Sequence, residues 1–282
     1  MLQKSYESNT KGILYVVPTP IGNKSDITLR ALEVLKSVDI IYAEDTRTSS
    51  VLLRMYEINK SLKACHLYNE EKIKYKVVDE LKQGKNIALI SDQGTPLLSD
   101  PGHELVNEVI KNNLNVVSLP GPSALLPALN MSGIEANKFI FYGFLNSKKS
   151  VAKKELESLK DLQFTLVFYE APHRFLSTLQ LILDILGDRN ISVCREITKI
   201  HEEIFRGKIS EAIEFYKDIK GEIVIVVEKG KIDTNFEELL NEVKSEIRKG
   251  LSNKDAVKLI SKKYGVSKNL LYNKNEEQKK WN

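Results

Sequence analysis

The stretch Gly-Ile-Leu-Tyr-Val-Val-Pro-Thr-Pro-Ile-Gly-Asn occupies residues 12–23. Its apolar run, Ile13–Val17, is typical of a buried strand, and the proline- and glycine-rich part that follows is typical of a rigid loop. Further on, Asp26 is suited to cap a helix over Ile27–Ser37. Strand and helix patterns alternate in this way to about residue 145. This alternation predicts parallel βαβ units, with helices on both faces of a mostly parallel sheet.

The second half of the chain follows a different rhythm. Three predicted strands, at Ile191–Arg195, near Glu203–Arg206 and at Glu222–Val227, follow one another over short connections, which favours antiparallel pairing and a mixed sheet. The last part of the chain is helical in pattern. We therefore predict an N-terminal α/β domain at residues 12–145, a C-terminal α/β domain at 146–230 and a small helical extension at 231–282.

The composition is that of an ordinary folded protein. Hydrophobic residues make up 42% and charged residues 28% of 282 residues, enough for a core without disulfides or structural metals. Cys65 and Cys194 form no CxxC pair, which indicates reduced core thiols in a cytoplasmic protein. The four histidines show no zinc-ligand spacing, so no metal site is predicted. No apolar run approaches the length of a membrane span, and residues 1–12 lack the apolar segment of a signal peptide.

The charge distribution is uneven. Lys and Arg number 42 against 38 Asp and Glu, a net charge of +4, and residues 231–282 hold all of this excess. Such a mild excess permits nucleic-acid binding without arguing for it. The lysine-rich segment 148–160 either binds an anion or forms a solvated helix face. The helical extension either contacts RNA in the manner of a helix-turn-helix or packs as a cap on the second domain.

Three loops of the N-terminal half share an unusual composition. They are Pro18–Asn23, Ser91–Gly102 and Pro120–Ala124, and each follows a predicted strand. Because ligands bind at the carboxyl ends of strands in open parallel sheets, three rigid loops at that edge predict a ligand site rather than three isolated turns. The chain has no P-loop motif, no G-x-G-x-x-G after the first strand and no G-x-S-x-G, which argues against P-loop, Rossmann dinucleotide and α/β-hydrolase sites.

Specific strings then point to a family. The 12–32 segment, Ala43–Arg47, the Ser91–Gly102 loop, Phe-Tyr-Glu-Ala-Pro-His-Arg at 168–174 and Arg-Glu-Ile-Thr-Lys at 195–199 together resemble ribosomal RNA small subunit methyltransferase I, of the tetrapyrrole methylase superfamily. The resemblance implies two α/β domains with S-adenosylmethionine between them, 2′-O-methylation of a cytidine ribose in 16S rRNA of the small ribosomal subunit, and a homodimer. Pro18 and Gln93 depart from the family pattern, which has alanine at both places.

The resemblance also implies roles for individual residues. Methyl transfer to a ribose hydroxyl requires alignment and a group that takes the proton or stabilises the alkoxide. Asp45, Glu170 and Lys199 are the candidates for this group, and the sequence does not choose among them. Asp45 is equally suited to cap a helix, and Glu170 to form an i,i+4 ion pair with Arg174. The expected cofactor residues are Pro20, Asp92, Gly94, Thr95, Pro96, Leu98, Ser123, Ala124 and Tyr169. The expected RNA-binding residues are Arg47, Lys148, Lys149, His173, Arg174, Arg195 and Arg206.

Two other functions fit the same sequence less well. A methylase of this fold that acts on a tetrapyrrole carbon would need a wide anion-binding cleft and no RNA surface. A non-catalytic RNA-binding assembly factor would not need intact cofactor loops. Binding of S-adenosylmethionine separates the second alternative from an enzyme.

Overall fold

The computed structural model describes residues 3–4, 11–230, 236–264, 266 and 268–280. Contacts divide the chain into two compact units, 1–229 and 230–282, and each is described by itself. The predicted helical extension begins one residue after this division. None of the helices among the described residues is long and apolar enough to cross a membrane.

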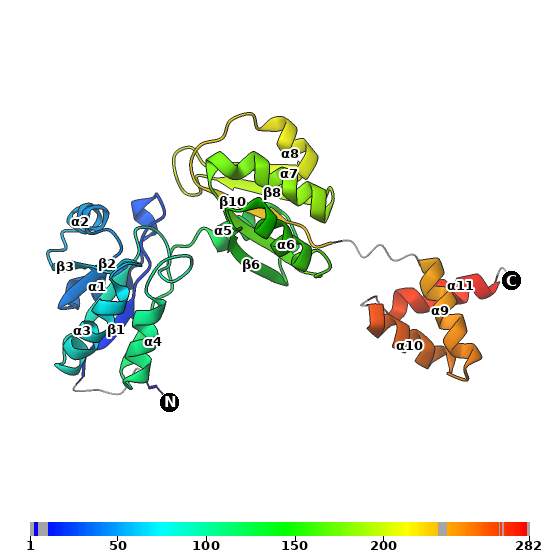
Figure 1. Ribbon diagram of the computed structural model, residues 1–282, viewed down its shortest axis with the longest axis horizontal. Coiled ribbons are helices and arrows are strands. Elements are labelled where there is room, and N and C mark those ends of the chain that lie inside the picture. The colour runs from blue at the N-terminus through cyan, green and yellow to red at the C-terminus, as the bar shows by residue number, and fades with distance from the viewer. Residues whose placement is uncertain (1–2, 5–10, 231–235, 265, 267, 281–282) are drawn as a thin grey trace. The chain divides into compact units, whose positions relative to one another are not determined.

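The first sheet of the larger unit is parallel throughout. Its strand order is β3-β2-β4-β1-β5, so β1 lies between β4 and β5. Figure 1 shows this sheet with its strands β1, β2 and β3 labelled. The strands are β1 (Ile13–Val16), β2 (Ile40–Ala43), β3 (Ser61–Ala64), β4 (Ile87–Ile90) and β5 (Asn115–Ser118). The helices are α1 (Leu29–Ser37), α2 (Thr46–Met55), α3 (Glu70–Lys82) and α4 (His103–Lys111), with a 3-10 turn η1 at Lys24–Asp26.

Helices cover both faces of this sheet, as the alternating pattern predicts. On one face α3 and α4 pack against the strands through residues such as Leu81 and Leu105, and on the other α1 and α2 do so through Leu35 and Leu53. All four side chains are almost fully buried. The central strands β2 and β4 are buried along their whole length, which explains their nearly continuous apolar sequences.

The second sheet is mixed. Its order is β6-β7-β10-β8-β9, in which only β6 and β7 are parallel and the other pairs are antiparallel. The predicted antiparallel pairing of the last three strands is therefore confirmed. The strands are β6 (Phe139–Phe144), β7 (Thr165–Glu170), β8 (Asn190–Arg195), β9 (Glu203–Lys208) and β10 (Ile223–Val227). The helices are α5 (Leu125–Ser132), α6 (Lys149–Leu159), α7 (Phe175–Leu186) and α8 (Ile209–Phe215), with a 3-10 turn η2 at Pro172–Arg174.

The strand β6 is part of the second sheet and the helix α5 packs on that sheet, although both precede the predicted domain boundary at residue 145. Ala128 and Leu129 of α5 pack against Val167 and Val226, on the face of the sheet opposite to α6, α7 and α8. The apolar sequence of α5 marks a buried helix but does not say which sheet buries it.

The start of α1 differs from the prediction. Thr28, not Asp26, is its N-cap, since the Thr28 hydroxyl accepts a hydrogen bond from the Ala31 N–H at 3.1 Å. Asp26 ends the preceding 3-10 turn and accepts a hydrogen bond from the Thr198 hydroxyl at 2.5 Å. The Asp26 carboxylate, which the local pattern assigned to capping α1, thus forms a tertiary contact with Thr198 instead.

The smaller unit consists of α9 (Phe236–Arg248), α10 (Asn253–Tyr264) and α11 (Lys268–Lys280). These helices have a core of their own, which includes Val243, Val257 and Leu271. The extension is therefore a small helical bundle with its own core, although Leu259 remains half-exposed.

Candidate active site

The three proline- and glycine-rich loops meet at one end of the first sheet. They follow β4, β1 and β5, which are adjacent strands. Thr19 and Gly94 exchange two backbone hydrogen bonds of 2.9 and 3.0 Å, and the Thr95 hydroxyl donates to the Pro122 carbonyl at 3.0 Å. The loops also pack tightly, because a Cβ on Gly121 would stand 2.7 Å from the Cβ of Pro18. The convergence predicted from the sequence is confirmed.

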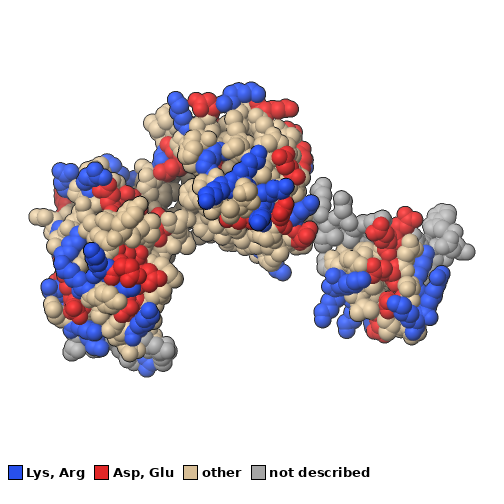
Figure 2. Space-filling model, viewed as in Figure 1, with Lys and Arg blue, Asp and Glu red and all other residues tan. Residues whose placement is uncertain are grey.

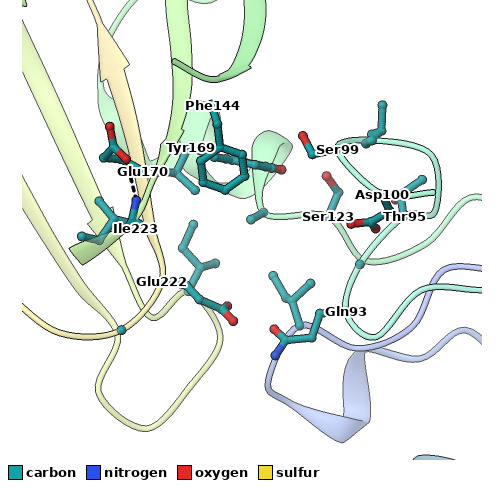
Figure 3. Close-up of a pocket in the computed structure, with 18 of the residues that line it drawn as sticks. Gln93, Thr95, Ser99, Asp100, Ser123, Phe144, Tyr169, Glu170, Glu222 and Ile223 are labelled. Atoms are coloured by element: carbon teal, nitrogen blue, oxygen red, sulfur yellow. Dashed lines mark hydrogen bonds between the residues drawn. The ribbon is translucent and has the colours of Figure 1, made fainter. Parts of the chain in front are cut away.

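A cavity of about 410 Å³ lies between these loops and the ends of β7 and β10. Figure 3 shows side chains from the loops on one side of it and side chains from the second sheet on the other. Its lining residues are Ile21, Gln93, Gly94, Thr95, Leu98, Ser99, Asp100, Ser123, Ala124, Phe144, Tyr169, Glu170, Ala171, Pro172, Ile197, Gly221, Glu222, Ile223 and Val224.

Most of the residues expected to bind a cofactor lie at this cavity. Gly94, Thr95, Leu98, Ser123, Ala124 and Tyr169 line it. Pro20, Asp92 and Pro96 do not. Asp92 instead faces the start of α2, where it accepts a hydrogen bond from the backbone N–H of Asp45 at 3.2 Å.

Two aromatic rings form one wall. Tyr169 and Phe144 make an edge-to-face contact with ring centroids 5.7 Å apart. The Tyr169 hydroxyl hydrogen-bonds with Ser123 and the N–H of Leu125, and these contacts tie β7 to the loop after β5. Burial raises the pKa of Tyr169. Sequence reasoning missed Phe144. The sequence signal for Phe144 is the neighbouring Gly143, because a glycine within a strand often marks a bulge. In the structure Gly143 has a positive φ of 78°, and a bulge in β6 redirects the chain there.

A carboxylate that the sequence analysis did not single out also lines the cavity. Burial raises the pKa of Asp100 to about 6, and the nearby carboxylates of Glu44 and Asp92 add to the shift. Glu44 and Asp92 likewise have raised pKa values, first because of burial and then because of their acidic neighbours. Asp100 was visible in the Ser91–Gly102 loop, but only the fold turns its side chain toward the cavity.

Of the three candidates for handling the proton, Glu170 alone lines the cavity. Its carboxylate is almost fully buried and accepts hydrogen bonds from the Thr178 hydroxyl at 2.5 Å and from the Ala171 N–H at 2.8 Å. The Arg174 Nε lies 3.5 Å from the Glu170 Oε1, which is the i,i+4 ion pair that the sequence also allowed. The charge of Glu170 is therefore held in place from within the protein.

Asp45 and Lys199 lie outside the lining. Asp45 caps α2 and forms a 2.6 Å ion pair with Arg47, whose hydrogen bonds lower the pKa of Asp45 to about 2. The Lys199 ammonium lies 2.9 Å from Glu196 and 3.1 Å from Glu222. Its aliphatic part covers Gly22, where a Cβ would approach it to 2.3 Å. Lys199 thereby connects the β8–β9 loop to the loop after β1.

The residues expected to bind RNA fall into two groups. Arg174 donates to the Leu145 carbonyl at 2.8 Å, Arg195 to the Lys220 carbonyl at 3.2 Å and Arg206 to the Met131 carbonyl at 2.6 Å, so all three hold parts of the protein together. The second group is Arg47, Lys148, Lys149 and His173, whose side chains are exposed, as is that of Arg206. Figure 2 shows Lys and Arg side chains gathered over the part of the larger unit that contains α6.

The comparison with known families identifies the fold. The profile of the family described as Tetrapyrrole (Corrin/Porphyrin) Methylases matches residues 13–213. The chain belongs to the tetrapyrrole methylase family. Solved structures agree: the methyltransferase CobJ matches with a TM-score of 0.60 at 18% identity, over 77% of this chain and 94% of CobJ. Uroporphyrin-III-C-methyltransferase from Thermus thermophilus matches with a TM-score of 0.56 at 17% identity, over 77% of this chain and 92% of that one.

Curated relatives are named Ribosomal RNA small subunit methyltransferase I, the family that the sequence resembles. The resemblance is thereby confirmed. A protein of this name from Bacillus subtilis is 46% identical, over 96% of this chain and 98% of its own. One from Haemophilus influenzae is 45% identical, over 93% and 95%. One from Thermotoga maritima is 48% identical over 218 residues, which cover 98% of that protein but 77% of this chain. No cluster of three metal-ligating side chains occurs within the described part of this methylase-family chain.

We predict that Asp100→Asn stabilises the protein at pH 8 but not at pH 4. The Asp100 carboxyl has a pKa near 3.9 when unfolded and about 6 when folded. Folding therefore favours its protonated form, and this contribution is lost as the pH rises from about 4 to 6. Asparagine carries no charge at any pH, so the variant should gain about 1–2 kcal/mol above pH 6, after allowance for partial exposure.

Urea unfolding at the two pH values measures this difference. Asp79→Asn, at an exposed position on α3, is the matched control. An Asp100→Asn variant with the same stability offset at pH 4 and pH 8 would contradict the assignment.

We also predict that Arg206→Ala lowers stability as well as positive charge. The Arg206 guanidinium donates twice to the Met131 carbonyl in the last turn of α5, at 2.9 and 2.6 Å. Loss of this exposed contact should cost about 0.5–1.5 kcal/mol of unfolding free energy. Lys149→Ala removes the same charge from an exposed position and should cost almost nothing. Equal denaturation midpoints for the two variants would show that Arg206 has no structural role.

Proposed function

We propose that this chain transfers the methyl group of S-adenosylmethionine to the ribose 2′ oxygen of a cytidine in 16S rRNA of the small ribosomal subunit. One observation carries the proposal: the three converging loops and the second sheet enclose a cavity with aromatic and acidic walls, in a chain 46% identical to a protein named Ribosomal RNA small subunit methyltransferase I. The choice of the 2′ oxygen, the identity of the donor and a homodimeric assembly rest on the sequence resemblance.

The residues at the cavity suit this donor. A volume of about 410 Å³ lies in the range of small-molecule sites, about 300–1,000 Å³. When bound, S-adenosylmethionine supplies a methyl group on a positively charged sulfur. The Asp100 carboxylate and the rings of Tyr169 and Phe144 would attract that charge. Gly94, with a φ of 77°, lets the loop backbone come close to the ligand.

Charge indicates which end of the cavity each substrate occupies. Asp100 has the carboxylates of Glu44 and Asp92 nearby, and such a group of negative charges repels phosphates. We therefore place the cationic donor at this end. The RNA would approach from the side of Arg174, which contacts the segment that leads to Lys148 and Lys149. These lysines would hold phosphates without selecting sequence.

We assign the proton of the ribose hydroxyl to Glu170. Its carboxylate is held in one orientation by Thr178 and Ala171, so a hydroxyl that enters the cavity meets an oriented acceptor. Asp45 is a poorer acceptor, because Arg47 holds its pKa at about 2. Lys199 remains paired with Glu196 and Glu222 and acts by positioning the adjoining loops.

The proposal predicts a ribose-methylated product. Small ribosomal subunits that lack the modification would be incubated with the protein and with S-adenosylmethionine labelled in its methyl group. Label should appear in the rRNA at one cytidine, as a linkage that resists alkaline hydrolysis. A protein that binds no donor would be an assembly factor instead, and transfer to a tetrapyrrole carbon but not to RNA would indicate the other branch of the fold.

Glu170→Gln should separate chemistry from binding. Removal of a positioned proton acceptor lowers kcat by about 10²–10⁴-fold, whereas the affinity for S-adenosylmethionine, measured by calorimetry, should stay within about threefold because the neutral amide keeps the shape of the side chain. Glu157→Gln, an exposed change on α6, is the control. If Glu170→Gln keeps the parent kcat, the proton goes elsewhere.

A further inference from the structure

Three lysines form an exposed stripe along α10 in the helical unit. Lys254, Lys258 and Lys262 are spaced four residues apart, which places them on one side of the helix, about 6 Å apart along its axis. The side that packs into the core of the unit carries Ala256 and Ile260. We call these three residues the lysine stripe.

The lysine stripe carries uncompensated charge. Nearby lysines have partners: Lys263 lies 2.8 Å from Glu242, and Lys249 lies 2.7 Å from Glu246. Within the part of the chain that the structure describes, none of the three stripe lysines has a carboxylate within 4.0 Å. Like charges four residues apart destabilise a helix, and Lys254 in the first turn also opposes the helix dipole. A negatively charged partner would remove both costs.

The position of the charge within the chain favours a polyanion as that partner. Residues 231–282 account for the whole net charge of +4, while the remainder is neutral. Figure 2 shows Lys and Arg gathered on both sides of the helical unit, with Asp and Glu between them. The substrate of the proposed function is a polyanion. Phosphates bind such lysines through counterion release, without base contacts.

The helical unit lies outside the family profile, although the relatives from Bacillus subtilis and Haemophilus influenzae match 96% and 93% of this chain and so share most of it. The family profile ends at residue 213. The relative from Thermotoga maritima is matched over 98% of its length, yet 23% of this chain has no counterpart in that match. A relative of the same name thus lacks a region of this size. A role in substrate affinity, rather than in the transfer step, fits this distribution.

We propose that the lysine stripe of α10 is a second RNA-binding surface, separate from the cavity, that holds phosphates of the substrate RNA. This inference rests on the proposed function, because the RNA is the substrate named there. Covalent attachment of the helical unit to the α/β unit would raise the local concentration of RNA at the cavity. The stripe should therefore change the affinity for RNA and leave the affinity for the donor and the rate of transfer at saturation unchanged.

The test uses the full-length chain with Lys254→Gln, Lys258→Gln and Lys262→Gln combined. The control combines Lys36→Gln, Lys72→Gln and Lys76→Gln, which removes the same charge from exposed positions on α1 and α3. Binding to labelled 16S rRNA is measured between 50 and 200 mM KCl. In the stripe variant the slope of log affinity against log salt should become shallower by about 2–3, and the affinity near 100 mM should fall roughly tenfold. Its KM for small subunits should rise with kcat unchanged.

Two outcomes would overturn the proposal. Equal slopes for the stripe and control variants would overturn it. A loss seen with assembled subunits but not with naked rRNA would also overturn it, and would indicate an acidic ribosomal protein as the partner. Far-UV circular dichroism should show unchanged helix content in both variants. If the stripe variant loses slope relative to the control but the parent transfers no methyl group, the proposed function fails and the RNA-binding role of the stripe stands.

Discussion

The pairing of β1 between β4 and β5 is the constraint on which the site depends. Parallel neighbours end at the same edge of a sheet, so this order alone brings together three loops that lie up to a hundred residues apart in the sequence. The two backbone hydrogen bonds between Thr19 and Gly94 then join two of these loops as though a short sheet continued beyond the strands. Proline and glycine suit such a place, because the loops need a fixed shape and a close approach.

The second sheet supplies what the loops lack. Its strand ends bring Tyr169 and Glu170 to the cavity, and the bulge at Gly143 brings Phe144 beside them. The loops contribute mostly backbone and small side chains, whereas these strands contribute aromatic rings and a held carboxylate. The division suits a site in which one part binds a small ligand and another part faces a second substrate.

The sequence predicts the architecture well because periodicity and loop composition are local signals. The parallel first sheet, the mixed second sheet and the meeting of the three loops all follow from them. The sequence-based predictions were wrong where a contact with a distant residue replaces the local contact that the pattern suggests. Asp26 contacts Thr198 instead of capping α1, and α5 packs on the sheet that follows it in the chain.

Charged side chains show the same limit more sharply. Arg174, Arg195 and Arg206 each donate to a backbone carbonyl of the same protein, and nothing in the sequence pattern indicates these contacts. Asp100 had no special signal beyond its place in a loop, and its raised pKa arises from burial beside Glu44, more than fifty residues earlier. Neither fact is contained in spacing or composition.

The path of the chain between the two sheets has a mechanical consequence. The segment 119–124 leaves the first sheet after β5, lines the cavity through Ser123 and Ala124, and leads directly into α5, which is fixed to the second sheet. This segment is the covalent link between the two sheets, which the contact between Asp26 and Thr198 also joins. A ligand that contacts Ser123 and Ala124 would therefore touch residues that join the sheets.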